Sequence, residues 1–305
     1  MLPRMVWAAL IVAILIVAGM GFEQVQRRRD RDRFPQVGRS VNIGGRSLNL
    51  YCSGEGTPAV ILESDGLTPG YGWVAVQRAI ATFTHACWYD RAGYGWSDPA
   101  PAPHTSTASA QDLHTLLQGA GLAPPYVLAG AGFGAFNVRV FCGLYPDEVA
   151  GVVVIDAHHE DEWEEERGGA SRIPFGLGYP PDWLLRTAGV IGLTRLAAPP
   201  NRTPLNTDGL TQSERDTLEG LARRASMRAA LMAERGFSAA PGEAHAAGGL
   251  GDRPLIVLTS EWKARSGREP PKASIQERLA RLSSRGRQQT GSTVSAVREV
   301  VNALR

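Results

Sequence analysis

Short apolar runs alternate with segments of helical spacing along most of the chain. Five of these runs are nearly continuous, as expected for strands that are covered on both faces: residues 59–63, 86–90, 126–129, 151–156 and 254–259. Between or after them, apolar residues recur with helical spacing at 73–83, 109–118 and 294–304. The alternation predicts an α/β domain with a mostly parallel sheet and helices on both faces.

Two further segments complete the predicted organisation. Two alternating runs about Gly44 and Gly45 predict a hairpin over residues 41–51. No strand pattern occurs between Asp156 and Pro254, a stretch too long to be a loop, and it contains a helical pattern at 213–236. We therefore expect a helical cap over the carboxyl edge of the sheet. The expected division is a membrane anchor and basic linker at 1–35, a core at 36–156 and 251–305, and a cap at 157–250.

The N-terminal region carries an apolar run without a charged side chain, residues 5–22. It reaches the lower end of the roughly 17–25 residues that cross a bilayer. No small-residue cleavage pattern follows, so we expect one uncleaved transmembrane helix rather than a signal peptide or a buried helix. The chain would then be a single-pass, membrane-anchored protein with residues 5–22 in the membrane.

Two signals disagree about the side of the membrane. Five arginines lie between Arg27 and Arg33, against Arg4 alone before the apolar run, and this bias favours a cytoplasmic domain. Cys52 and Cys87 lie in segments expected to be adjacent strands, where they form either two buried thiols or a disulfide. A disulfide would favour an oxidising compartment. The sequence leaves the side open.

Composition excludes some classes of function. The chain has 305 residues, 43% of them hydrophobic, which suits one large α/β domain or two small ones. A net charge of +2 argues against a nucleic-acid-binding surface. The six histidines are scattered and no C-x-x-C pair occurs, so no metal-ligand spacing and no cofactor is indicated.

The most informative motif lies between the strand at 126–129 and a helical run from Ala135. Residues 130–134, Gly-Ala-Gly-Phe-Gly, have the frame of the nucleophile elbow G-x-S-x-G, in which a sharp strand-to-helix turn exposes a serine hydroxyl. The central position is Gly132, which adopts positive φ without the cost of roughly 1–3 kcal/mol that other residues incur. The motif predicts a retained turn without a nucleophile.

Three segments carry a resemblance to a known family: YDRAGYGWSDP at 89–99, PYVL at 125–128 and YPDEVAG at 145–151. They resemble the α/β-hydrolase superfamily, particularly its small bacterial membrane-anchored, esterase-like members, and the resemblance extends from about residue 38 to 303. It implies an α/β-hydrolase fold and a triad of serine, histidine and acid, in which the histidine takes the proton of the serine.

The resemblance places the triad positions on this chain. The nucleophile position is Gly132. The histidine belongs in a loop after the eighth strand, but no histidine follows His245, and residues 285–292 run directly into the last helix. We therefore expect the base, and the eighth strand with it, to be missing. Asp156, at the end of a strand, and Glu261, just past the next one, are the candidates for the acid.

The oxyanion hole of the family is also altered. It is built from the N–H after the nucleophile, here that of Phe133, and one from the loop after the third strand, here Ser64-Asp65-Gly66. Asp65 stands where relatives carry glycine. A carboxylate pointing into the pocket would oppose a developing oxyanion rather than stabilise it.

Other residues offer alternative chemistry. Ser64 and Ser97 lie near the same edge of the sheet, and His158 and His159 follow Asp156 directly. The spacing Gly130-x-Gly132-x-x-Ala135, with Asp156 ending the next strand, also satisfies the dinucleotide fingerprint, although that motif belongs to the first β-α-β unit of a domain.

Three functions follow from these patterns. The first is a catalytically inactive hydrolase-fold protein that binds a small apolar ligand or a partner under the cap. The second is an active hydrolase of ester or related bonds that uses non-standard residues. The third, more remote, is a dinucleotide-binding enzyme. The missing histidine segment favours the first, because ligand binding needs the pocket but not the base.

Overall fold

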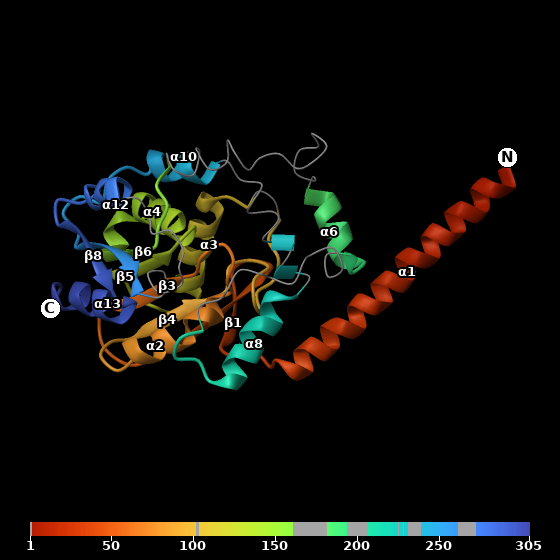
Figure 1. Cartoon of the computed structure of the whole chain (residues 1–305), viewed down its shortest axis with the longest axis horizontal. Coiled ribbons are helices and arrows are strands. Elements are labelled where there is room, and N and C mark those ends of the chain that lie inside the picture. The colour runs from red at the N-terminus through yellow and green to blue at the C-terminus, as the bar shows by residue number, and fades with distance from the viewer. Residues whose placement is uncertain are drawn as a thin grey trace.

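The computed structural model has an eight-stranded sheet at its centre, with the strand order β1-β2-β4-β3-β5-β6-β7-β8 (Figure 1). The strands are β1 Arg39–Asn42, β2 Ser47–Ser53, β3 Ala59–Glu63, β4 Ala86–Tyr89, β5 Tyr126–Ala131, β6 Val149–Ile155, β7 Leu255–Ser260 and β8 Gly286–Gly291. The structure describes residues 2–101, 104–160, 182–193, 207–224, 226–227, 229–230, 239–261 and 273–305. β1 and β2 pair antiparallel, β2 pairs antiparallel with β4, and the remaining pairs are parallel, which confirms the predicted fold class.

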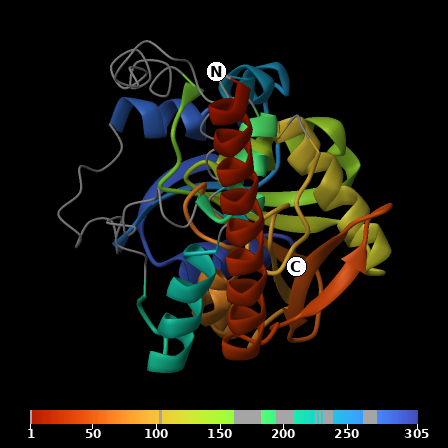
Figure 2. The ribbon, with the colours of Figure 1, turned by 90° about the vertical axis from the view of Figure 1, so that its right-hand side faces the viewer.

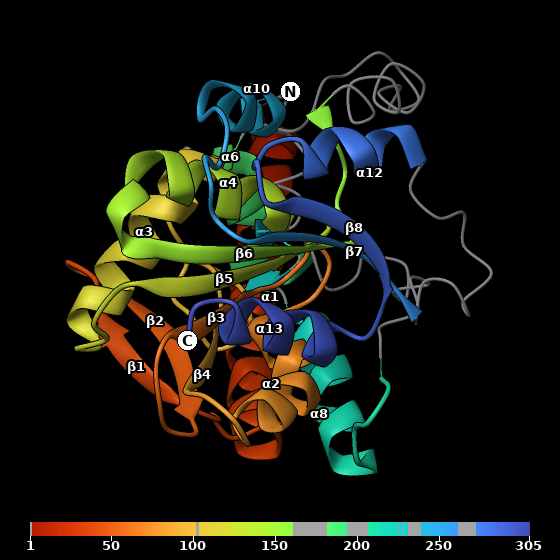
Figure 3. The same cartoon turned by 90° about the vertical axis from the view of Figure 1, so that its left-hand side faces the viewer.

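Helices cover both faces of this sheet (Figure 3). The described helices are α1 Leu2–Arg33, η1 Gly70–Trp73, α2 Val74–Ile80, α3 Ser106–Gly119, α4 Gly134–Leu144, η2 Pro146–Glu148, α6 Asp182–Val190, α8 Gln212–Ala222, α10 Ala239–Ala246, α12 Ala273–Ala280 and α13 Thr293–Asn302. One apolar cluster joins the sheet to α3, α4, α10 and α12. A second joins the opposite face to α2, α8 and α13. The central strands are apolar throughout because each is buried by both clusters.

The prediction that the eighth strand is missing was wrong. β8 pairs in parallel with β7 over its whole length, from Gly286 beside Leu255 to Gly291 beside Ser260. Its sequence, GRQQTG, carries no apolar alternation because β8 is an edge strand whose side chains are partly or fully exposed. Backbone pairing with β7 and an ion pair between Arg287 and Glu299 on α13 hold it, and hydrophobic patterning cannot detect such a strand.

The insertion between β6 and β7 contains helices α6, α8 and α10 among its described residues. The helix predicted at 213–236 begins as α8, which ends at Ala222. Residues 226, 227, 229 and 230 are again helical, and residues 225, 228 and 231–238 lie outside the described residues. α10 packs against α3 and α4 in the first apolar cluster. The predicted domain boundaries remain a prediction.

α1 is long and apolar enough to span a membrane. An 18-residue window has a mean hydropathy of 2.5, and none of it is buried. Its N-terminal half extends away from the α/β domain, whereas its C-terminal end reaches the domain (Figure 1), and Figure 2 views the molecule from the side of α1. There Phe34 is buried, and its carbonyl accepts a hydrogen bond from Trp96 Nε1 at 3.2 Å.

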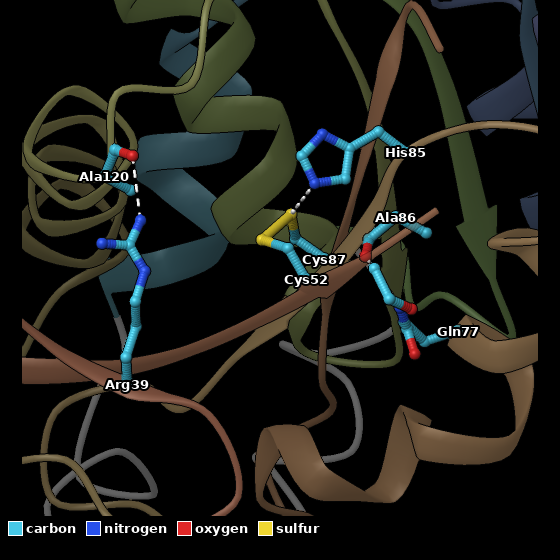
Figure 4. Close-up of a disulfide and its surroundings, with 8 residues drawn as sticks. Arg39, Cys52, Gln77, His85, Ala86, Cys87 and Ala120 are labelled. Carbon is cyan, nitrogen blue, oxygen red and sulfur yellow. Dashed lines mark hydrogen bonds between the residues drawn. A yellow bond between two sulfur atoms is a disulfide. The ribbon is translucent and has the colours of Figure 1, made fainter. Parts of the chain in front are cut away.

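A disulfide joins the antiparallel part of the sheet to its parallel part. Cys52 on β2 and Cys87 on β4 are directly paired residues, and their sulfurs are bonded (Figure 4). Of the two alternatives that the sequence left open, the structure has the bridge rather than two thiols. Cys142 on α4 is buried and free.

Candidate functional site

The candidate site is built around the turn between β5 and α4. Gly132 has φ +50°, and its N–H donates to the Ile155 carbonyl at the end of β6 at 2.9 Å. The flanking glycines are required by close packing: a Cβ on Gly130 would lie 2.8 Å from the Gly134 carbonyl oxygen, and one on Gly134 would meet the Ser64 carbonyl oxygen. The turn is therefore fixed by contacts on either side, while its central residue carries no reactive atom.

Asp65 lies over this turn. Its Cβ is 3.2 Å from the point that a Cβ on Gly132 would occupy. Its carboxylate is directed back to its own loop, where Oδ1 accepts a hydrogen bond from the Leu67 N–H at 2.8 Å. The Gly66 carbonyl accepts from the Tyr94 hydroxyl at 3.0 Å. The loop predicted to form half of an oxyanion hole thus places the Asp65 side chain beside Gly132, with its carboxylate bonded to the Leu67 N–H.

Phe133 provides the other expected oxyanion position. Its side chain is buried and its ring packs edge-on against Phe136, with centroids 5.9 Å apart. It is the residue before α4, so its N–H belongs to the first turn of the helix. This keeps the positive end of the helix dipole at the elbow.

The two acid candidates lie on neighbouring strand ends. Asp156, directly after β6, has φ +48°, and its carboxylate bonds Ser260, which ends β7: Oδ1 accepts from the Ser260 N–H at 2.9 Å and Oδ2 from its hydroxyl. Glu261, the next residue, is exposed. The Asp156 carboxylate therefore ties the ends of β6 and β7 together, and the structure places it next to the Gly132 turn through Ile155.

The dinucleotide alternative meets two obstacles in this geometry. The glycine motif follows β5 in the middle of the sheet rather than the first strand of a β-α-β unit. Both oxygens of the Asp156 carboxylate are already bonded to Ser260, so they are engaged where a ribose hydroxyl would have to bind.

The segment that would carry the catalytic base is reduced to one residue. β8 ends at Gly291 and α13 begins at Thr293. Ser292 between them is the N-cap of α13, and its hydroxyl accepts the Ser295 N–H at 3.2 Å. No loop is left in which a histidine could reach the elbow from this position.

Three histidines lie toward the same edge of the sheet as Gly132. His158 and His159 follow β6, as the sequence indicated, and His159 Nδ1 is 3.6 Å from Glu160 Oε2. His104 was not identified from the sequence. It precedes α3, the crossover from β4 to β5, and such a helix begins at the carboxyl edge of a parallel sheet. The topology that reveals it follows only from the strand order.

The two alternative serines make structural bonds. Ser97 Oγ donates to the Asp90 carbonyl at 2.6 Å and accepts the Asn49 N–H at 2.8 Å. Ser64 is buried, with Oγ 3.4 Å from Arg91 Nη1. Ser97 therefore holds the turn after β4, while Ser64 lies against a buried cation.

A buried ion pair between Glu63 and Arg91 lies next to the elbow, and the sequence analysis did not identify it. Arg91 Nη1 donates to Glu63 Oε1 at 2.7 Å and to the Ser64 carbonyl at 2.6 Å, and Arg91 Nη2 donates to the Asp65 carbonyl at 2.8 Å. Asn137 on α4 donates to Glu63 Oε1 at 2.9 Å. The only sequence signal was a carboxylate ending an apolar strand.

Two further groups complete this buried polar layer. Tyr89 donates to Glu63 Oε2, and burial together with the Glu63 charge raises the pKa of its phenol well above the usual value. Burial also raises the pKa of Asp90, although its carboxylate accepts the N–H groups of Gly70 at 2.8 Å and Trp96 at 3.1 Å. Asp90 thereby fixes the turn at 90–97 on which the family resemblance depends.

One group of potential metal ligands occurs among the described residues, at the opposite end of β4. The ligand atoms of Cys52, His85 and Cys87 lie within 4.8 Å of one another (Figure 4). Because the two sulfurs are bonded to each other, they are not thiolate ligands while the bridge is intact. In the sequence, His85 lies two residues before Cys87, and this spacing could have indicated the group.

The chain was compared with known proteins. Residues 61–187 match the family model of the alpha/beta hydrolase fold. An AB hydrolase superfamily protein of Gibberella zeae is 28% identical over 146 residues, covering 44% of this chain and 45% of that protein. An uncharacterized vacuolar membrane protein of Saccharomyces cerevisiae is 30% identical over 108 residues, covering 34% and 17%. The chain thus spans less than half of the length of either relative.

Solved structures share the fold over most of the chain. A thermophilic esterase from Thermogutta terrifontis superposes with a TM-score of 0.57 at 18% sequence identity, over 88% of this chain and 99% of the esterase. That identity supports a common fold and no more. With the family match over residues 61–187 and the sheet order, it shows that the chain has the alpha/beta hydrolase fold, in agreement with the resemblance found in the sequence.

Proposed function

We propose that this chain is a membrane-anchored hydrolase-fold protein that does not hydrolyse esters and binds a small apolar ligand beneath the helices that follow β6. The observation that carries the proposal is the single residue, Ser292, between β8 and α13. A triad enzyme needs a base within hydrogen-bond reach of its nucleophile, and this junction supplies neither a histidine nor a loop to carry one.

The elbow supports the same function. A hydroxyl nucleophile is replaced by Gly132, and Asp65 occupies the adjacent space. The loop after β3 is nevertheless firmly held, because Arg91 pairs with Glu63 and donates to the carbonyls of Ser64 and Asp65. Such a pair costs several kcal/mol of desolvation per ion. A firmly held frame without a nucleophile or a base suits a site that binds rather than converts its ligand.

The apolar character of the ligand is inferred from the elbow. Phe133 lies next to Gly132, with Phe136 packed behind it. At the acid position, the Asp156 carboxylate already accepts two hydrogen bonds from Ser260. Ligand sites are mostly apolar with a few convergent polar groups, and we propose a site of this kind beside Phe133.

The full chain, purified in detergent, tests this function directly. We expect no turnover of short acyl esters, no labelling by a serine-directed fluorophosphonate, and a co-purified apolar compound in the mass spectrum of an organic extract. Labelling of any serine would overturn the inactivity. An extract without any such compound, together with no thermal shift across a panel of fatty acids and their alcohols, would overturn ligand binding.

An active hydrolase with non-standard residues is the second candidate. The observation in its favour is the position of His104, His158 and His159 toward the edge that holds Gly132. Under this alternative, ester turnover would be measurable in the unmodified chain, and one of the three changes His104→Ala, His158→Ala or His159→Ala would abolish it. The other two variants serve as matched controls.

We further propose that the domain faces an oxidising compartment. The disulfide between Cys52 and Cys87 supports this side, because such bridges persist in oxidising compartments. The arginines after the apolar run favour the opposite side. A reporter enzyme that is active only after export, fused to the C-terminus, decides between them. Activity supports the proposal, and an inactive but stably expressed fusion overturns it.

A further inference from the structure

Exposed large hydrophobic side chains gather on two elements of the described structure. Most lie on α1, within its apolar part. Four lie elsewhere, and three of these belong to residues 182–193, here called the α6 segment. They are Leu184, Val190 and Leu193, whose side chains are 43%, 49% and 49% exposed. The fourth, Leu144, is 44% exposed and ends α4. Scattered exposed leucines need no explanation, but a concentration on one short segment does.

The α6 segment packs directly against α1. A Cβ on Gly19 would lie 2.6 Å from the Ile191 carbonyl oxygen, so only glycine allows this approach. On the other side of the contact, the Cβ position of Gly192 is 3.4 Å from the Phe22 ring and 3.6 Å from Glu23 Cβ. Glu23 is buried by this contact, and its carboxylate accepts Arg27 Nε at 2.9 Å.

This contact lies at the level where α1 changes from apolar to charged. The apolar run ends at Phe22, and the first arginine of the basic stretch is Arg27. Residues 19–23 therefore mark the boundary between hydrocarbon and headgroups in a helix that spans a bilayer. α6 lies across α1 at this level, and the N-terminal half of α1 projects beyond it (Figures 1 and 2).

We propose that the α6 segment is a second membrane contact, which lies in the interface of the bilayer beside α1 with Leu184, Val190 and Leu193 directed into the lipid. The proposal rests on the membrane anchoring by α1 stated above. A lipid surface is the occupant because the exposed apolar side chains are continuous with the span and begin where it leaves the bilayer. Interfacial helices bury their apolar face roughly 5–10 Å into the headgroup boundary.

The arrangement has a consequence for the ligand. The α6 segment belongs to the insertion that follows β6, the strand next to the elbow. If the α6 segment lies in the bilayer interface, the part of the site that it covers, next to the elbow, faces lipid rather than water. An apolar ligand then reaches the site by diffusing within the membrane, where its concentration far exceeds that in water.

Lipid quenching of a fluorophore tests the proposal on the full chain in phosphatidylcholine nanodiscs. The native cysteines do not interfere, because two are bridged and burial raises the pKa of the Cys142 thiol to about 12. Bimane is attached to one introduced cysteine in each of four variants: Val12→Cys, Leu184→Cys, Leu193→Cys and Leu144→Cys. Leu144 is the matched control, with nearly the same exposure as Leu184 but on α4, on the far side of the domain from α1 (Figure 1). Emission is compared with and without nitroxide-labelled lipid.

Each outcome decides between the contact and the anchor. We expect strong quenching at positions 12, 184 and 193 and unchanged emission at position 144. Quenching at 12 with none at 184 and 193 would overturn the second contact and leave the anchor intact. No quenching at 12 would overturn the anchor and the second contact together. Equal quenching at 144 would mean that the domain contacts lipid without a preferred face, which also contradicts the proposal.

Discussion

Asp65 and Gly132 meet across the elbow, with the Asp65 Cβ 3.2 Å from where a Cβ on Gly132 would lie. Any side chain at position 132 would therefore lie against Asp65. A serine at 132 would meet the strain of its positive φ and the Asp65 side chain at once. We therefore expect the effects of changing the two residues to depend on each other.

Replacement of Gly132 by serine is expected to destabilise the protein without restoring hydrolysis. The φ of +50° costs a non-glycine residue roughly 1–3 kcal/mol, and the Asp65 contact adds to that cost. Urea unfolding measures the loss. Gly121→Ser is the matched control, since Gly121 has φ +73° with no atom within 4 Å of its Cβ position. Adding Asp65→Gly to Gly132→Ser should recover the excess loss. Ester turnover in either variant would reveal a base that the proposed function excludes.

The buried pair of Glu63 and Arg91 is expected to be the most sensitive polar contact near the elbow. Arg91→Met leaves the Glu63 carboxylate buried without its cation, and such changes cost roughly 3–5 kcal/mol. Arg223→Met provides the comparison, because Arg223 pairs with Glu219 on the surface at 3.0 Å, and exposed pairs contribute about 0–1 kcal/mol. Equal losses of unfolding free energy in the two variants would contradict a supporting role for the buried pair.

The elements that the sequence predicted correctly are those whose signal is local. β3, β5, β6 and β7 are continuous apolar runs, and the elbow is five adjacent residues. β8 was missed because an edge strand bonded on one side needs no apolar pattern. The Asp156 contact was not predictable, since Ser260 lies 104 residues away and only the pairing of β6 with β7 brings them together.

The buried polar groups next to the elbow were also not predictable, because they come from distant parts of the sequence. Glu63 ends β3, Arg91 lies in the loop after β4, and Asn137 lies on α4. Their meeting therefore depends on strand order and not on any motif. For the disulfide, the sequence predicted the strands but not the bond. Adjacent strands were predicted for Cys52 and Cys87, but the choice between thiols and a bridge needed the register that makes them direct partners.

Stability is expected to fall in acid through Glu160. Burial raises the pKa of this carboxyl, but the bonds from Arg139 at 2.6 and 3.1 Å outweigh burial and lower it from 4.5 to about 2. The stabilisation is therefore complete above about pH 4.5 and is lost as the pH falls toward 2, because the unfolded chain takes up the proton first. Unfolding free energy measured from pH 6 to pH 2 should decline across this window.

The variant Glu160→Gln separates this effect from general acid unfolding. It leaves the buried Arg139 without its counter-ion, so stability at neutral pH should fall as well. The decrease in unfolding free energy between pH 4.5 and pH 2 should be smaller in the variant than in the unmodified protein. His159 and His245 also face Glu160, at 3.6 and 3.4 Å, and they are left unchanged in both proteins. An identical pH profile in the two would assign the acid sensitivity to other carboxyls.

The bridge between Cys52 and Cys87 is expected to stabilise the domain mainly by restricting the unfolded chain. A separation of 35 residues corresponds to a loss of about 2–4 kcal/mol when the bridge is removed, whether by Cys52→Ala with Cys87→Ala or by a reductant. The two treatments should lower the urea midpoint of the protein similarly, and reductant should have no further effect on the double variant. Because Cys142 is buried with its thiol pKa raised to about 12, it contributes nothing to the redox response of the native state. A midpoint that is insensitive to reductant in the unmodified protein would mean that the two cysteines are thiols, and the argument for an oxidising compartment would fall with the bridge.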